Sequence, residues 1–111
     1  MSDAWKNFER RVAKKLGGER IPVADKRSHL DVINNEFAVE CKYRKKLSMF
    51  LKDAIMQAEE GRGDKMPIVA LGEKYSSDII IMLKIENFLI LIGEKDEHGT
   101  RVEKALSDPQ D

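Results

Sequence analysis

The sequence predicts an α/β fold in which a mixed central sheet is flanked by helices. Three observations point to this class. Apolar residues at helical spacing open the chain, short strand-like segments follow, and a second helical stripe precedes further strands. The resulting order, α-β-β-β-α-β with a further strand and one ambiguous segment, brings early and late strands together in one sheet. The 111 residues are enough for one domain with a modest core.

The first helix is predicted from four apolar residues at helical spacing, namely Trp5, Phe8, Val12 and Leu16. Ser2 can cap its start, and the pair Gly17-Gly18 ends it. The segment "RIPV" is extended, because Pro22 forbids a helix and restricts the residue before it. It is predicted as the first strand.

The next two strands, "SHLDVI" and "EFAVECKY", are predicted to form a hairpin. Asn34-Asn35 can serve as a two-residue turn, because Asn tolerates a positive φ. Side chains alternate along a strand, so Glu40 and Lys42 share one face. With this turn, Asp31 is a diagonal neighbour of Glu40 on that face, about 7–8 Å away at the backbone. A four-residue loop preserves the shared face, whereas a three-residue loop breaks it.

The second half begins with a helical stripe over residues 47–58, with Ser48 as a cap and Gly61 as a stop. "PIVALG" and "SDIIIMLK" are predicted strands. "IENFLILIG" fits a helix by its apolar spacing, although "FLILI" alone fits a strand. We therefore expect one domain over residues 1–93 and a polar, frayed tail over residues 94–111.

Composition restricts the class of protein. A single cysteine, Cys41, fits a reducing compartment, so a cytoplasmic location is expected. The longest apolar runs have five residues, far fewer than the roughly 20 of a membrane-spanning helix. Residues 1–46 hold 12 Lys/Arg and 7 Asp/Glu, a net charge of +5, and residues 47–111 hold 8 and 13, a net charge of −5. The basic half suggests a surface that faces a polyanion; chance clustering is the alternative.

The acids and the lysine of the hairpin suggest metal chemistry. Two converging carboxylates repel each other unless a cation joins them. Oxygen ligands suit Mg²⁺ or Mn²⁺ better than Zn²⁺. Lys42 beside them can hold a phosphate oxygen or help to deprotonate a water molecule, which indicates phosphodiester hydrolysis. The alternative is a surface ladder of salt bridges among Asp31, Glu40 and Lys42.

The pattern "LDV…VECK" resembles the signature of the PD-(D/E)xK nuclease superfamily, an acid on one strand and acid-x-Lys on the next. Here the acid is Asp31 and the triplet is Glu40-Cys41-Lys42. The superfamily has a restriction-endonuclease-like αβββαβ core, and the resemblance covers roughly residues 3 to 92. More narrowly, "FERRVAKKL", "RSHLDV", "FAVECKYRKKL", "DAIMQA" and "PIVAL" resemble Holliday-junction-resolvase-like nucleases, including small phage-encoded ones. Leu30 stands where the superfamily signature has a proline.

This resemblance implies a Mg²⁺-dependent DNA endonuclease, with Mn²⁺ as a substitute, that leaves a 5′-phosphate. The implied catalytic residues are Asp31, Glu40, Lys42, Glu9 and Gln57. The implied metal ligands are Asp31, Glu40, Glu9 and the Cys41 carbonyl. Resolvases cut two strands symmetrically, so a homodimer acting on branched or four-way DNA is expected. If the chain is phage-encoded, its location is the host cytoplasm.

Further residues are expected to contact DNA, namely Lys26, Arg27, Ser28, His29, Arg44, Lys45 and Lys46. The run "KYRKK" continues the strand that carries Glu40, so its cations can meet phosphates beside the cleaved bond. Two other functions remain open. One is a nuclease for flaps, ends or other branched DNA, and the other is a non-catalytic DNA-binding module on a nuclease fold.

Overall fold

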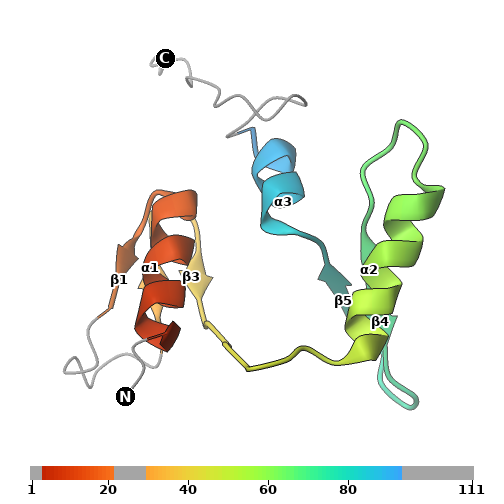
Figure 1. Ribbon diagram of the computed structural model, residues 1–111, viewed down its shortest axis with the longest axis horizontal. Coiled ribbons are helices and arrows are strands. Elements are labelled where there is room, and N and C mark those ends of the chain that lie inside the picture. Colours follow the sequence, from red (N-terminus) through yellow and green to blue (C-terminus); the bar gives the residue numbers. More distant parts are fainter. Residues whose placement is uncertain (1–3, 22–29, 94–111) are drawn as a thin grey trace. The chain divides into compact units, whose positions relative to one another are not determined.

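The computed structural model describes residues 4–21 and 30–93, which fall into two compact units, Met1–Lys46 and Leu47–Asp111 (Figure 1). The described elements follow the order α1-β1-β2-β3-α2-β4-β5-α3. The coarse prediction of an α/β protein is confirmed. The predictions on Ser2, Pro22 and the tail over residues 94–111 lie outside the described residues.

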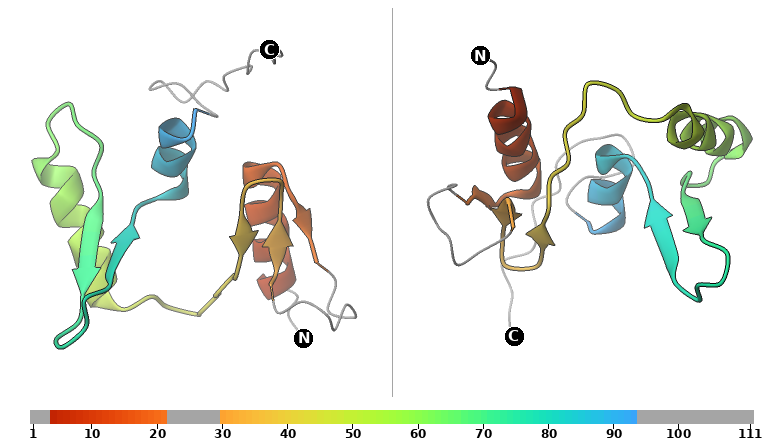
Figure 2. Two further views of the ribbon diagram at one scale, coloured as in Figure 1. Left: turned by 180° about the vertical axis from the view of Figure 1, so that it is seen from behind. Right: turned by 90° about the horizontal axis from the view of Figure 1, so that it is seen from below.

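The first unit consists of one helix and three short strands. Helix α1 spans Ala4–Leu16, and the strands are β1 (Glu19–Arg20), β2 (Val32–Ile33) and β3 (Ala38–Val39). The strands form an antiparallel sheet in the order β1-β2-β3, and α1 contacts both β1 and β2 (Figure 2). Each ladder has only two residue pairs, so the predicted strands over residues 28–33 and 36–43 are much longer than the observed ones.

Helix α1 ends where the sequence predicts and then makes a close approach to the sheet. Gly17 has a φ of +66°, a conformation that glycine adopts without steric cost. At Gly18, a Cβ atom would lie 2.5 Å from the Ile33 backbone oxygen, so only glycine fits. The buried centre of α1 consists of Glu9 and Ala13, whereas Trp5 is exposed at 40%. The buried face therefore includes an acid, which the apolar stripe did not predict.

The predicted two-residue turn between β2 and β3 is wrong. The observed pairs are Val32 with Val39 and Ile33 with Ala38, which leaves a loop over residues 34–37. The Asn34 side-chain oxygen accepts hydrogen bonds from the N–H groups of Glu36 and Phe37, at 2.7 and 2.6 Å. Asn34 therefore closes a longer turn with its side chain instead of occupying a tight hairpin turn with its backbone.

The second unit contains helix α2 (Met49–Gly61), strands β4 (Val69–Gly72) and β5 (Ile79–Met82), and helix α3 (Ile85–Leu91). Ser48 caps α2 as predicted, because its hydroxyl accepts a hydrogen bond from the N–H of Leu51 at 3.3 Å. The ambiguous "IENFLILIG" segment forms the helix α3. Strands β4 and β5 pair in an antiparallel hairpin from Val69–Met82 to Gly72–Ile79.

Within the described ranges, the strands form two antiparallel sheets, one in each unit, and a single mixed central sheet stays a prediction. Strand β5 pairs only with β4 among these strands, and its residues Ile79, Ile80 and Ile81 are exposed. None of the three helices that the structure describes is long and apolar enough to cross a membrane.

Candidate functional site

Asp31 is fixed by backbone bonds to both of its neighbouring segments. Its N–H donates to the Val39 oxygen, and its own carbonyl accepts from the N–H of Ile21, both at 2.8 Å. Its Oδ2 accepts a hydrogen bond from the N–H of Cys41 at 2.6 Å. The carboxylate is therefore held against the chain that follows β3, beside Glu40.

Glu40 and Lys42 lie just beyond β3. The Lys42 Nζ is 3.1 Å from Glu40 Oε2, and the two side chains are 75% and 47% exposed, so solvent screens this ion pair. The last observed pair of the ladder is Val32 with Val39. Asp31 precedes Val32 and Glu40 follows Val39, so the two acids stand at the next pair of positions along the same register. The predicted diagonal relation between the two acids is thus wrong, because the turn has four residues. That the two acids share a face of the sheet stays a prediction.

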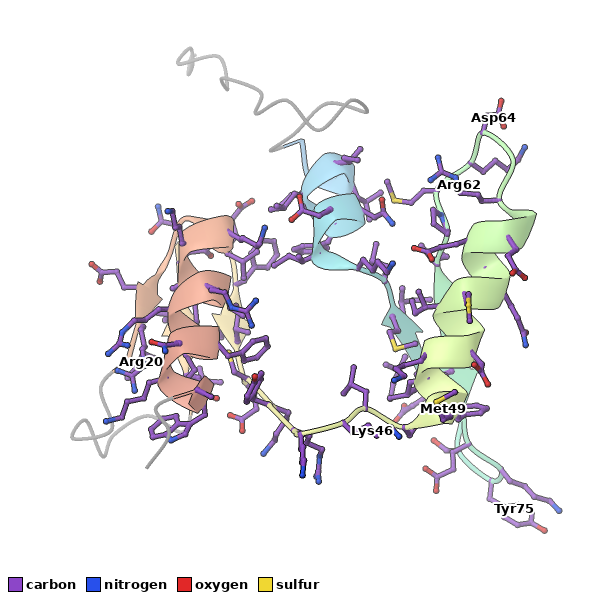
Figure 3. All side chains as sticks on the ribbon, viewed as in Figure 1. Arg20, Lys46, Met49, Arg62, Asp64 and Tyr75 are labelled. Carbon is purple, nitrogen blue, oxygen red and sulfur yellow. The ribbon has the colours of Figure 1, made fainter. Side chains whose placement is uncertain are left out.

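Glu9 is buried and already has a cationic partner. Arg20 Nε lies 2.7 Å from Glu9 Oε1, and only 19% and 9% of the two side chains are exposed. Figure 3 labels Arg20 in the first unit. The Arg20 guanidinium also lies over the Trp5 ring, 5.6 Å from its centroid. Arg20 was not among the predicted site residues. Its sequence signal is an arginine directly after the first helix, close enough to fold back onto it.

The thiol of Cys41 reports the negative charge of this region. Burial of the thiol is the largest cause that raises its pKa to about 11, and the charges of Asp31, Glu9 and Glu40 raise it further. The three predicted acids therefore act on one point of the first unit. Cys41 itself is a half-buried free thiol.

These acids do not form a ready-made metal cluster. Over residues 4–21 and 30–93, no group of three or more His, Cys, Asp or Glu side chains could hold a metal ion. Asp31 and Glu40 each use one carboxylate oxygen in the bonds above, and the other oxygen has no partner among the described residues. Because Mg²⁺ is commonly bound by one or two carboxylates and keeps several waters, this pair of donors suits it chemically.

The other predicted site residues lie in three different parts of the chain. Arg44, Lys45 and Lys46 are exposed in the extended stretch after Lys42, where Figure 3 labels Lys46. Gln57 is exposed on α2 and belongs to the second unit, so its role beside Asp31 stays a prediction. The remaining predicted contacts, at residues 26–29, lie outside the described residues.

The chain was compared with protein families, curated proteins and solved structures. No protein-family model matches the chain, and no curated protein or solved structure matches it. The resemblance to PD-(D/E)xK nucleases therefore stays a prediction from the residues quoted above.

Proposed function

We propose that this protein is a metal-dependent DNA endonuclease whose substrate is a four-way junction. One observation carries the proposal: the end of a single hairpin gathers Asp31, Glu40 and Lys42, with the Asp31 carboxylate bonded to the N–H of Cys41. Besides burial, the charges of Asp31 and Glu40 contribute to the raised pKa of Cys41, which supports a negative potential at this end of the hairpin. Clustered carboxylates with an adjacent lysine suit hydrolysis of a phosphodiester.

Each residue has a separate role in this proposal. Asp31 and Glu40, with the Cys41 carbonyl, would hold Mg²⁺ or its substitute Mn²⁺. When bound, such an ion supplies an activated water and neutralises charge on the phosphate. Lys42, which is mostly exposed, would turn its ammonium from Glu40 to a phosphate oxygen.

The proposed DNA surface continues from the acids along the chain. Arg44, Lys45 and Lys46 are exposed and follow Lys42 directly. The unit that contains them, residues 1–46, has a net charge of +5. Exposed cations in a row can neutralise successive phosphates and release their counterions. This charge supports DNA as the polyanion.

We also propose a homodimer, because symmetric cutting of a junction needs two sites. The second unit supports this with exposed apolar residues on β5 and with an open groove of about 520 Å³. Leu51, Ile55 and Met82 are among the residues that line this groove. Sedimentation of the full chain at micromolar concentration tests the proposal, and a monomer alone and on a junction would contradict it.

The direct test is incubation of the protein with end-labelled four-way junction, linear duplex and flap DNA. Each substrate is tested with Mg²⁺, Mn²⁺ and EDTA. We expect paired symmetric nicks on the junction with either ion and none with EDTA. Preferential cutting of the flap or of the duplex end would instead assign the chain to a nuclease for other DNA structures.

The second candidate is a non-catalytic DNA-binding module. The observation that favours it is the absence of a three-residue metal cluster among the described side chains. This candidate predicts a shifted junction band in a gel and intact strands with every divalent ion. The same incubation therefore separates the two functions.

A further inference from the structure

Arg20 and Glu9 form the most deeply buried ion pair in the described part of the chain. The pair joins α1 to β1, with a separation of 2.7 Å between Nε and Oε1. In the ladder between β1 and β2, Arg20 is paired with Val32, the residue directly after Asp31. Val32 is completely buried. The pair therefore lies beside the proposed metal site, one strand away from one of its ligands.

This ion pair opposes the use of Glu9 as a metal ligand. A buried carboxylate that leaves its arginine must break a charge-assisted hydrogen bond and leave the guanidinium buried without a counter-charge. The freed guanidinium would then lie near a divalent cation, which it repels. Asp31 and Glu40 face no such obstacle, since one accepts a backbone N–H and the other pairs with an exposed lysine.

We propose that Arg20 is a positioning residue that withholds Glu9 from the metal ion, so that Asp31 and Glu40 bind the ion without it. This inference depends on the proposed function for the existence of the metal site. Arg20 limits the charge of the site to two ligand carboxylates and keeps the third acid neutralised in the interior. Loss of Arg20 frees Glu9, and the freed carboxylate becomes an additional ligand.

The test is the dissociation constant for Mn²⁺, measured with the full chain by titration calorimetry in the absence of DNA. We expect Arg20→Gln to bind Mn²⁺ roughly ten-fold more tightly, the effect of one charge-assisted interaction transferred from Arg20 to the ion. The double variant Arg20→Gln/Glu9→Gln should bind Mn²⁺ like the parent chain, because it removes both the added ligand and the unpaired guanidinium. Arg10→Gln is the matched control, because it removes an exposed arginine of α1 that bonds Asn7.

A spectroscopic measurement separates this role from a purely structural one. Trp5 is the only tryptophan of the chain, and the Arg20 guanidinium lies over its ring. Because Arg20 stays with Glu9, saturating Mg²⁺ should leave Trp5 emission unchanged in the parent chain. Arg20→Gln should alter that emission before any metal is added.

Several outcomes would overturn the inference. Weaker Mn²⁺ binding by a folded Arg20→Gln/Glu9→Gln variant would show that Glu9 is a ligand in the parent chain. Unchanged binding by a folded Arg20→Gln variant would show that Arg20 withholds nothing. If Arg20→Gln does not fold, the double variant, which leaves neither charge of the pair buried, still decides. Mn²⁺ binding that Asp31→Asn leaves intact would instead refute the proposed metal site, and with it both proposals.

Discussion

The two units of the chain differ in what they bury. The first unit buries the carboxylate of Glu9 against Arg20, beside the fully buried Val32. The second unit buries Leu89 but exposes the apolar residues of β5. Their net charges are +5 and −5 over residues 1–46 and 47–111. The comparison teaches that the first unit combines a buried ion pair with an exposed group of charged residues at the hairpin end, whereas the second unit exposes an apolar strand.

The largest expected effect comes from removing one carboxylate at a time from each unit and comparing DNA cleavage. Asp31→Asn keeps an oxygen that can accept the N–H of Cys41 but removes the charge, and Glu40→Gln does the same beside Lys42. We expect either change to reduce junction cleavage below detection and to leave junction binding in gel shifts nearly unchanged. Asp78→Asn, in the loop between β4 and β5, is the matched control and should cleave normally. Near-normal cleavage by either site variant would show that the site lies elsewhere.

The apolar contrast can be tested within one helix of the second unit. Leu89 is 1% exposed and Leu91 is 64% exposed, and both belong to α3. Leu89→Ala should lower the free energy of unfolding by about 2–5 kcal/mol, because it leaves a cavity, whereas Leu91→Ala should change it by less than about 0.5 kcal/mol. Urea unfolding followed by circular dichroism measures both. Equal losses would mean that α3 does not pack through Leu89.

The charge contrast predicts which cations meet DNA. Replacing Arg44, Lys45 and Lys46 with glutamine should reduce the slope of log affinity against log salt by up to about 2.7, since each lost phosphate contact contributes about 0.9. The matched control replaces three exposed cations of the second unit, namely Arg62, Lys65 and Lys74. Junction binding between 50 and 200 mM salt, roughly the range over which such contacts act, measures the slope. Equal slopes for the two triple variants would contradict the assignment.

The smallest expected effect concerns the thiol of Cys41. With its pKa at about 11, this thiol should react with iodoacetamide more slowly at pH 8 than a free cysteine does. Since the folded pKa exceeds the ordinary value of 9.0, the folded protein holds the proton more tightly, and stability should fall as pH rises from about 9 to about 11. Glu40→Gln should speed alkylation modestly by removing one negative charge. A thiol that reacts as fast as free cysteine at pH 8 would contradict the raised pKa that burial and the neighbouring acids give it.

Local signals in the sequence predicted the elements well. The glycine pair after α1, the Ser48 cap and the Gly61 stop depend on the backbone of a few adjacent residues, and each appears where expected. The turn at Asn34 failed because its side chain bonds two backbone N–H groups and also donates to the Leu16 carbonyl. The bond to Leu16 joins residues 18 positions apart, and the turn preferences of adjacent residues cannot predict such a contact.

Some of the contacts among the candidate site residues were predicted for the same reason. The acid-x-Lys spacing implied that Glu40 and Lys42 are close, and their ion pair confirms this. The bond between Asp31 and the N–H of Cys41, and the partner of Glu9, depend on how strands and helix meet. Apolar periodicity placed Glu9 at the edge of a stripe, but an arginine from β1 makes that position suitable for a buried acid.

The outer edge of β5 has a practical consequence for work with this protein. The run Ile79-Ile80-Ile81 contains neither charge nor proline, and β4 is its only partner among the described strands. Such an edge can recruit identical strands from other molecules and start fibrous precipitation in concentrated stocks. Ile80→Lys would place a positive charge in the run, which opposes pairing between molecules, and should delay the rise of turbidity in concentrated preparations.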